Sequence, residues 1–148
     1  MTTFSRREAL SAIAVTGTSL TLTGCMPQNS NPGAKLPASG VRVGALSDFP
    51  RVGSFKELDL GDTPTVVIRT AKPQTQGVSA GEVNLVALSK VCTHLGCLVN
   101  APKGETLGCA CHGSLFDANT GAVKNGPAGN PLPSFKLEIR ADGVFAIP

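Results

Sequence analysis

The sequence contains no tryptophan and no tyrosine, and aromatic residues make up only 4% of its 148 residues. Glycine and proline, by contrast, number 17 and 11. This composition favours turns and short strands over long helices. Beyond the N-terminal segment we find neither a sustained helical period nor an internal repeat. We therefore predict an all-β domain of small antiparallel sheets.

Charge is also scarce. Only 16% of the residues are charged, and the formal net charge is +3. Two arginines and one glutamate of the first segment contribute to this value, so the rest of the chain carries +2. A charge this small gives no reason to expect nucleic acid or an anionic membrane surface as a partner. The length leaves room for an N-terminal segment and one domain of roughly 100 to 120 residues, but not for two.

The N-terminal segment has the features of an export signal. The stretch Ser5–Leu10, SRREAL, resembles a twin-arginine motif, with Ala9 where a bulky apolar residue is usual. The stretch Ser11–Gly24 is uncharged, but it is too short and too polar to predict a membrane span. Leu22–Cys25, LTGC, resembles the lipobox of bacterial lipoproteins, in which the cysteine is lipidated.

These features predict a division of the chain into three parts. Residues 1–25 are the export signal, residues 26–40 a flexible tether rich in Pro, Asn, Ser and Gly, and residues 41–148 the functional domain. The domain is then exported and held at the outer face of the cytoplasmic membrane, or in the periplasm, by its leader or by lipidated Cys25. The alternative is an uncleaved, weakly hydrophobic signal anchor in which Cys25 occurs by chance.

Several stretches of the domain have strand patterns. Thr65–Arg69 and Val83–Ser89 are β-branched or apolar runs, each too short for a helix. Near the end, apolar and charged residues alternate from Phe135 to Arg140, which predicts a strand with one buried face. Asp142-Gly143 then predicts a hairpin turn with positive φ angles.

Both histidines and four of the five cysteines fall in two short runs, VCTHLGC at 91–97 and CACHGSLF at 109–116. Cys92 and His94 are two residues apart, so on an extended backbone they face one centre while the residue between them points elsewhere. Cys109 and His112 can converge across a turn. These four residues form a complete ligand set. They suit a zinc ion, but one Cys and one His from each loop suit a two-metal cluster better, with both thiolates on one iron and both imidazoles on the other.

The two remaining cysteines of these runs are Cys97 and Cys111. A disulfide between them would tie the loops together and would need an oxidising compartment, which the leader provides. The alternative is a pair of unpaired core cysteines.

The pair of motifs, CTHLGC and CxCHGS, resembles that of the Rieske iron-sulfur proteins. The resemblance covers 41–148 and includes FDANTGAVKNGPA at 116–128. It implies a Rieske-type fold and a [2Fe-2S] cluster, with Cys92 and Cys109 on one iron and His94 and His112 on the other. It also implies a disulfide between Cys97 and Cys111, which belongs to the high-potential branch and is absent from the ferredoxins of aromatic-ring dioxygenases.

The resemblance extends to the surroundings of the cluster. Ser114 matches a hydroxyl that bonds a bridging sulfide, although an ordinary turn serine is the alternative. Phe116 stands where a tyrosine is frequent, and the missing hydroxyl predicts a lower reduction potential. Leu95 is expected to give apolar contact beside the histidines. The stretch 126–128 resembles the start of a Pro-rich covering segment, here interrupted by Gly129-Asn130.

The functional expectation is one-electron transfer in an oxidoreductase, not complete catalysis by this chain alone. A quinol hydroxyl would bond to His94 or His112, as in the Rieske subunit of a quinol:cytochrome c oxidoreductase, with cytochrome b and c-type redox subunits as partners. The close alternative is the small subunit of an exported molybdenum oxidase, as in arsenite oxidase, partnered by its large subunit. A structural zinc module and a cytoplasmic ferredoxin are more remote alternatives.

Overall fold

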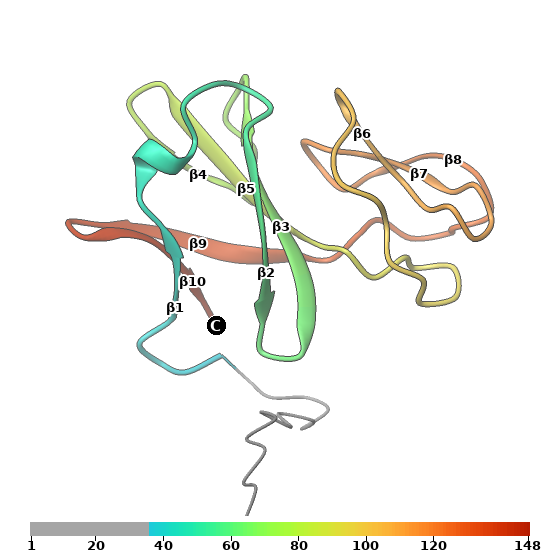
Figure 1. Cartoon of the computed structure of the whole chain (residues 1–148), viewed down its shortest axis with the longest axis horizontal. Helices are drawn as coiled ribbons and strands as arrows, with labels where there is room; N and C mark the ends of the chain where they lie inside the picture. The colour runs from blue at the N-terminus through green and yellow to red at the C-terminus, as the bar shows by residue number, and fades with distance from the viewer. Residues whose placement is uncertain (1–35) are drawn as a thin grey trace, which may run out of the picture.

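The computed structural model describes residues 36–148, so the predicted leader with Cys25, and most of the tether, lie outside the described residues. Within this part of the chain, strands alternate with turns, and the only helical element is a single 3-10 turn (Figure 1). The prediction of an all-β domain is confirmed. The elements are β1 (Val41–Gly44), η1 (Leu46–Asp48), β2 (Phe55–Leu60), β3 (Thr63–Thr70), β4 (Val78–Ala80), β5 (Val83–Ser89), β6 (Thr106–Gly108), β7 (Leu115–Asp117), β8 (Val123–Asn125), β9 (Ser134–Arg140) and β10 (Gly143–Ile147).

Seven strands form one antiparallel sheet, in the order β1-β10-β9-β5-β3-β2, with β4 also paired to β5. β4 and β9 share one edge of β5: β4 pairs with its beginning and β9 with Ala87 and Leu88. The sheet curls upon itself on the left of Figure 1, so that β9 and β10 cross the direction of β2 and β3. One side of the curled sheet encloses a core, and the other faces the cysteine-bearing loops.

β3 and β5 are buried on both faces, which explains their continuous apolar sequences. Val66 and Ile68 of β3 pack in one core with the loop cysteines, while Val67 between them packs in the core inside the curled sheet. Side chains alternate along a strand, so one apolar run serves both cores. These two strands therefore form the rigid support on which the loops rest.

β9 and β10 form a hairpin, as the sequence predicted, and it lies between β1 and β5 in the sheet. Along β9, Leu137 is buried while its neighbours Lys136 and Glu138 are exposed. Gly143 pairs with Arg140, which leaves Ala141 and Asp142 as the two loop residues. Only Gly143 of the Asp-Gly pair has a positive φ, at 144°, so the prediction of positive φ is wrong for Asp142.

Three short strands, β6, β7 and β8, form a second antiparallel sheet on the right of Figure 1. Leu107 and Phe116 of this sheet are fully buried against residues of β3 and β5. The core that joins the two sheets also contains Cys92 and Cys109, so hydrophobic packing decides where the cysteine-bearing loops sit. No helix in residues 36–148 has the length and apolar character that crossing a membrane requires.

Candidate iron-sulfur cluster site

Two loops carry the predicted ligands, and each starts from a strand that is held in place. The first follows β5, where Lys90 accepts a hydrogen bond from Val99 and thereby closes the base of the loop. The second joins β6 to β7, whose residues Gly108 and Leu115 are paired across its base. A hydrogen bond from the amide of Asn100 to the carbonyl of Gly108 links the two bases at 2.8 Å. The loops are therefore parts of one rigid unit.

The two loops share one backbone hydrogen-bonding pattern. In the first, the amide of Gly96 donates to the carbonyl of Cys92 at 2.9 Å, and the amide of Cys92 donates to the carbonyl of Cys97 at 2.7 Å. In the second, Gly113 and Cys109 form the equivalent bond at 3.0 Å, and the amide of Cys109 donates to Ser114 at 2.8 Å. Gly96 and Gly113 both have φ near 75°, a conformation that glycine adopts without strain. Each glycine lets its loop turn back after the histidine.

The structure brings the two histidines together at the tip of these loops. The ring centroids of His94 and His112 lie 4.8 Å apart, with the rings nearly perpendicular. The side chain of His112 is exposed and that of His94 is half-buried. Nδ1 of His94 is buried and has no hydrogen-bond partner among residues 36–148. A buried polar nitrogen without a partner costs free energy unless something else binds it, and an imidazole nitrogen is a common metal ligand.

Cys92 and Cys109 are free thiols, 2% and 3% exposed, and both belong to the core that joins the two sheets. Cys97 and Cys111 form a disulfide that joins the tips of the loops. The sulfur atoms of Cys97, Cys109 and Cys111 lie within 4.8 Å of one another, but two of them are bonded to each other and so cannot bind a metal. The donors that remain are two buried thiols and two adjacent imidazoles, which is the donor set of a Rieske centre. The residues fit a [2Fe-2S] cluster.

The residues expected around the cluster occupy three different environments. Ser114 is fully buried, and its hydroxyl accepts a hydrogen bond from the amide of Ala128 at 3.2 Å. The ring of Phe116 is also fully buried and packs in the core with both free cysteines. Leu95, beside His94, is 68% exposed. The tip of the loops therefore combines polar imidazoles with an apolar side chain that faces outward.

The segment 126–133 lies against both loops, despite the interruption at Gly129-Asn130. At one end, Gly126 approaches the second loop so closely that a Cβ atom there would lie 2.5 Å from Cα of Ser114. Further along, the carbonyl of Asn130 accepts a hydrogen bond from the hydroxyl of Thr93 at 2.6 Å. We did not predict this contact: the sequence gives no signal that two polar residues 37 positions apart will meet.

Downstream of the second loop, Asp117 organises the turn that leads to β8. Oδ1 accepts hydrogen bonds from the amides of Asn119 and Thr120, and Oδ2 lies 2.9 Å from Nζ of Lys124. Partial burial raises the pKa of Asp117, but the lysine and the two amides outweigh it, so the net pKa lies below its ordinary value. The sequence FDANTG therefore has a structural role in supporting the loop.

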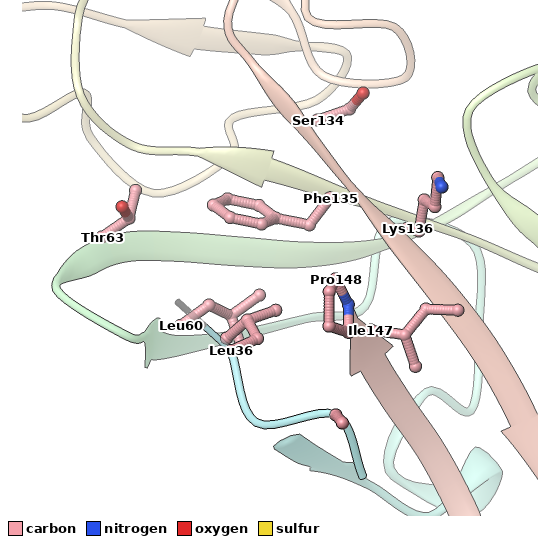
Figure 2. A pocket seen from close by; sticks show the side chains of 9 residues that line it. Leu36, Leu60, Thr63, Ser134, Phe135, Lys136, Ile147 and Pro148 are labelled. Carbon is pink, nitrogen blue, oxygen red and sulfur yellow. The ribbon is translucent and has the colours of Figure 1, made fainter. Parts of the chain in front are cut away.

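A groove of about 700 Å³ lies away from the predicted ligands, at the ends of the β2-β3 hairpin, β9 and β10 (Figure 2). Its lining contains neither cysteine nor histidine, and no acidic side chain, so it is not suited to bind iron. It is lined by Leu36, Ala38, Leu60, Thr63, Ser134, Phe135, Lys136, Ile147 and Pro148.

The model of the Rieske [2Fe-2S] domain family matches residues 39–136, which is more than half of the chain and contains both loops and the segment that covers them. The chain belongs to the Rieske [2Fe-2S] domain family. Its cofactor is a Rieske [2Fe-2S] cluster, and it is an electron-transfer protein. The zinc alternative is therefore wrong.

Known relatives of this Rieske protein belong to several electron-transfer complexes. A Haloferax mediterranei protein named as the Rieske subunit of a respiratory nitrate reductase is 35% identical over 110 residues, covering 68% of this chain and 49% of that protein. The Rieske iron-sulfur subunit of the Streptomyces lividans cytochrome bc1 complex is 31% identical over 129 residues, covering 79% of this chain and 75% of that subunit. The chain thus spans about half the length of the first and three quarters of the second.

Among solved structures, the Rieske protein resembles the plasma membrane Rieske protein PetC3 of the cyanobacterium Synechocystis. The two share 28% identity and superpose with a TM-score of 0.58, over 73% of this chain and 99% of the other. The predicted fold, a Rieske-type all-β domain with a subdomain of two loops, is therefore confirmed.

Proposed function

We propose that this Rieske protein is the iron-sulfur subunit of a quinol:cytochrome c oxidoreductase of the cytochrome bc type, exported and held at the membrane by its N-terminal segment. Cys92 and Cys109 would hold one iron, and His94 and His112 the other. When bound, the cluster supplies one-electron chemistry. The observation that carries the proposal is the placement of both imidazoles side by side at the tip of the loops, which also contain two buried free thiols.

Each histidine has two ring nitrogens, and these two nitrogens would have different roles. Because Nδ1 of His94 is buried and has no partner within the described part of the chain, this nitrogen suits the iron, and the other ring nitrogen is left to face the surroundings. The exposed ring of His112 offers a second polar atom next to it. A quinol hydroxyl could form a hydrogen bond to one of these nitrogens and transfer its proton there, while Leu95 contacts the apolar quinol ring.

The disulfide supports assignment to the high-potential branch. Cys97 and Cys111 tie together the two loops that carry the histidines. Neutral imidazoles in place of anionic thiolates raise the reduction potential, which suits a protein that takes electrons from quinol. The similarity to a cytochrome bc1 subunit over most of its length agrees with this function.

The test is the reduction potential of the purified protein as a function of pH. We expect a high potential that falls by up to about 59 mV per pH unit for each coupled proton, beginning near or above neutrality. A low potential that does not change with pH would contradict the proposal and would indicate a ferredoxin-like carrier.

The second candidate is the small subunit of an exported molybdenum oxidase. The similarity to a protein named as a nitrate reductase subunit supports this candidate, since that name assigns a Rieske subunit to a complex other than the cytochrome bc type. Purification of the chain from its native membrane separates the two candidates. A b-type haem that co-purifies with it supports the first function, and a molybdenum-containing subunit supports the second.

A further inference from the structure

One free thiol of the site lies beside the disulfide. Sγ of Cys109 is within 4.8 Å of both disulfide sulfurs, those of Cys97 and Cys111. Cys92, the other free thiol, is not part of this group of sulfurs. A thiolate next to a disulfide is the arrangement that thiol-disulfide exchange requires.

We propose that, in the chain without its cluster, Cys109 exchanges with the disulfide and forms a new bond to Cys97. The proposal deepens the proposed function, and rests on it, in taking Cys109 as a cluster ligand. While Cys109 is a ligand, its sulfur is not free to react. Loss of the cluster is then the event that starts the exchange.

The reaction balances without an oxidant or a reductant. The thiolate of Cys109 attacks Sγ of Cys97, the bond between Cys109 and Cys97 forms, and the bond between Cys97 and Cys111 breaks. The electron pair of the broken bond leaves on Sγ of Cys111, which takes up the proton that Cys109 has lost. One disulfide and the same number of thiols are present before and after.

Burial decides which sulfur leaves. Cys111 is exposed, so water solvates its thiolate as it departs, whereas Cys97 is half-buried. Attack on Cys111 instead would release the less exposed Cys97 and would close a very small ring between residues only two apart. The expected product therefore joins Cys97 to Cys109.

The product could not rebind a cluster, because one of the four ligands is consumed. After losing its cluster, this domain would thereby become inactive without any external oxidant. A thiol reductant, or the reverse exchange in which Cys111 attacks Cys97, would restore the free thiol of Cys109. The second loop alone supplies both the attacking and the leaving sulfur, because it carries the cluster ligand Cys109 and the disulfide cysteine Cys111.

The experiment is peptide mapping of the full chain after its cluster has been removed by an iron chelator, without oxygen and without added thiols. Free thiols are alkylated after several hours near pH 8, where an ordinary thiol is partly ionised and reshuffling takes seconds to hours. Trypsin then releases 91–103, with Cys92 and Cys97, and 104–124, with Cys109 and Cys111. Fragmentation of the linked pair shows which cysteine of 104–124 is alkylated.

We expect alkylation to move from Cys109 to Cys111 as the incubation proceeds. In a Cys109→Ser variant, alkylation of Cys111 should be at least about tenfold lower. A matched Cys92→Ser variant, which also lacks a thiol ligand, should exchange like the original chain. Alkylation that stays on Cys109 would overturn the proposal.

Unfolding is distinguished by its own product. In guanidinium, Cys92 reaches Cys97 easily, so a disulfide within 91–103 is the expected result there. If the chain without its cluster gives this same product, exchange occurs through unfolding and the proposal is wrong. The iron content and the visible spectrum before chelation test the cluster separately, so failure of the exchange and failure of the proposed function can be told apart.

Discussion

The hydroxyl of Thr93 donates a hydrogen bond of 2.6 Å to the carbonyl of Asn130, which joins the first ligand loop to the segment that covers it. Thr93 stands between the predicted ligands Cys92 and His94, so its side chain points away from the cluster site and toward the cover. The covering segment has a second attachment through the amide of Ala128 and the hydroxyl of Ser114. Each ligand loop is therefore joined to the segment 126–133 by one side-chain hydroxyl.

Replacing Thr93 by valine should weaken the contact between the first loop and the segment 126–133. Valine keeps the shape of threonine but cannot donate the hydrogen bond to the carbonyl of Asn130. One hydrogen bond contributes about 1 kcal/mol, so we expect the cluster to be lost to a chelator about five times faster. The measurement is the decay of visible absorbance. Thr93→Ser, which keeps the hydroxyl, should lose the cluster at nearly the original rate. Equal rates for the valine variant and the original chain would contradict the role of this contact.

Ser114→Ala should lower the reduction potential while the iron content stays unchanged. The hydroxyl accepts a bond from Ala128, so its own proton is still available to donate to a cluster sulfur. A bond of about 1 kcal/mol that favours the reduced form corresponds to roughly 40 mV for one electron. The measurement is a redox titration.

Ser89→Ala is the matched control for this prediction. Ser89 is also buried, and its hydroxyl accepts a bond from the amide of Val91 at the base of the first loop. Ser89→Ala removes only this hydrogen bond to the backbone, so it should leave the reduction potential unchanged. A Phe116→Tyr variant tests the opposite direction and should raise the potential. If Ser114→Ala and Ser89→Ala shift it equally, the serine acts only through the backbone.

Removing the disulfide in a Cys97→Ala, Cys111→Ala double variant should destabilise the domain. The two cysteines are 14 positions apart, and a closed loop of this length contributes about 3 kcal/mol in the chain-entropy model. The measurement is urea unfolding of the variant and of the original chain, both in their cluster-free forms and near pH 5, where an ordinary thiol stays protonated and disulfide exchange is slow. A difference below about 1 kcal/mol would mean that packing alone holds the loops together.

Asp117 should stabilise the domain in a pH-dependent way. Its pKa in the folded state is lowered below the ordinary 3.8, so the unfolded chain takes up its proton first. The stabilisation is complete above that ordinary pKa and is lost as the pH falls through the lower folded value. Asp117→Asn, which removes the charge but keeps an acceptor, should cost about 0.5 to 1 kcal/mol at pH 7.

The measurement for Asp117 is urea unfolding at neutral pH and near pH 3. The stability of the Asp117→Asn variant should approach that of the original chain at the acidic pH, whereas Asp117→Ala, which also loses the turn hydrogen bonds, should stay less stable at both by about 1 to 3 kcal/mol. A constant difference for the asparagine variant would show that the charge contributes nothing.

The local patterns were sufficient to predict some of the strands, and the family. The apolar run at 83–89 and the alternation from Phe135 to Arg140 both form strands as predicted. A strand buried on both faces has a continuous apolar sequence, and a strand buried on one face has an alternating sequence, so both can be read locally. The prediction of positive φ angles at Asp142-Gly143 was correct for Gly143 only. The turn type depends on the register of the two strands, which the local sequence does not specify. The spacing of cysteines and histidines was enough to indicate the cofactor, because few centres take one thiolate and one imidazole from each of two loops.

What the sequence determined by itself is therefore the chemistry: which side chains can bind metal, and that two short loops present them. Only the tertiary structure decided the geometry. It placed the rings of His94 and His112 4.8 Å apart, brought Cys109 beside the disulfide, and set Thr93 against Asn130. The physical reason is that these contacts join residues far apart in the chain, and the packing of the two sheets over a shared core sets their distances.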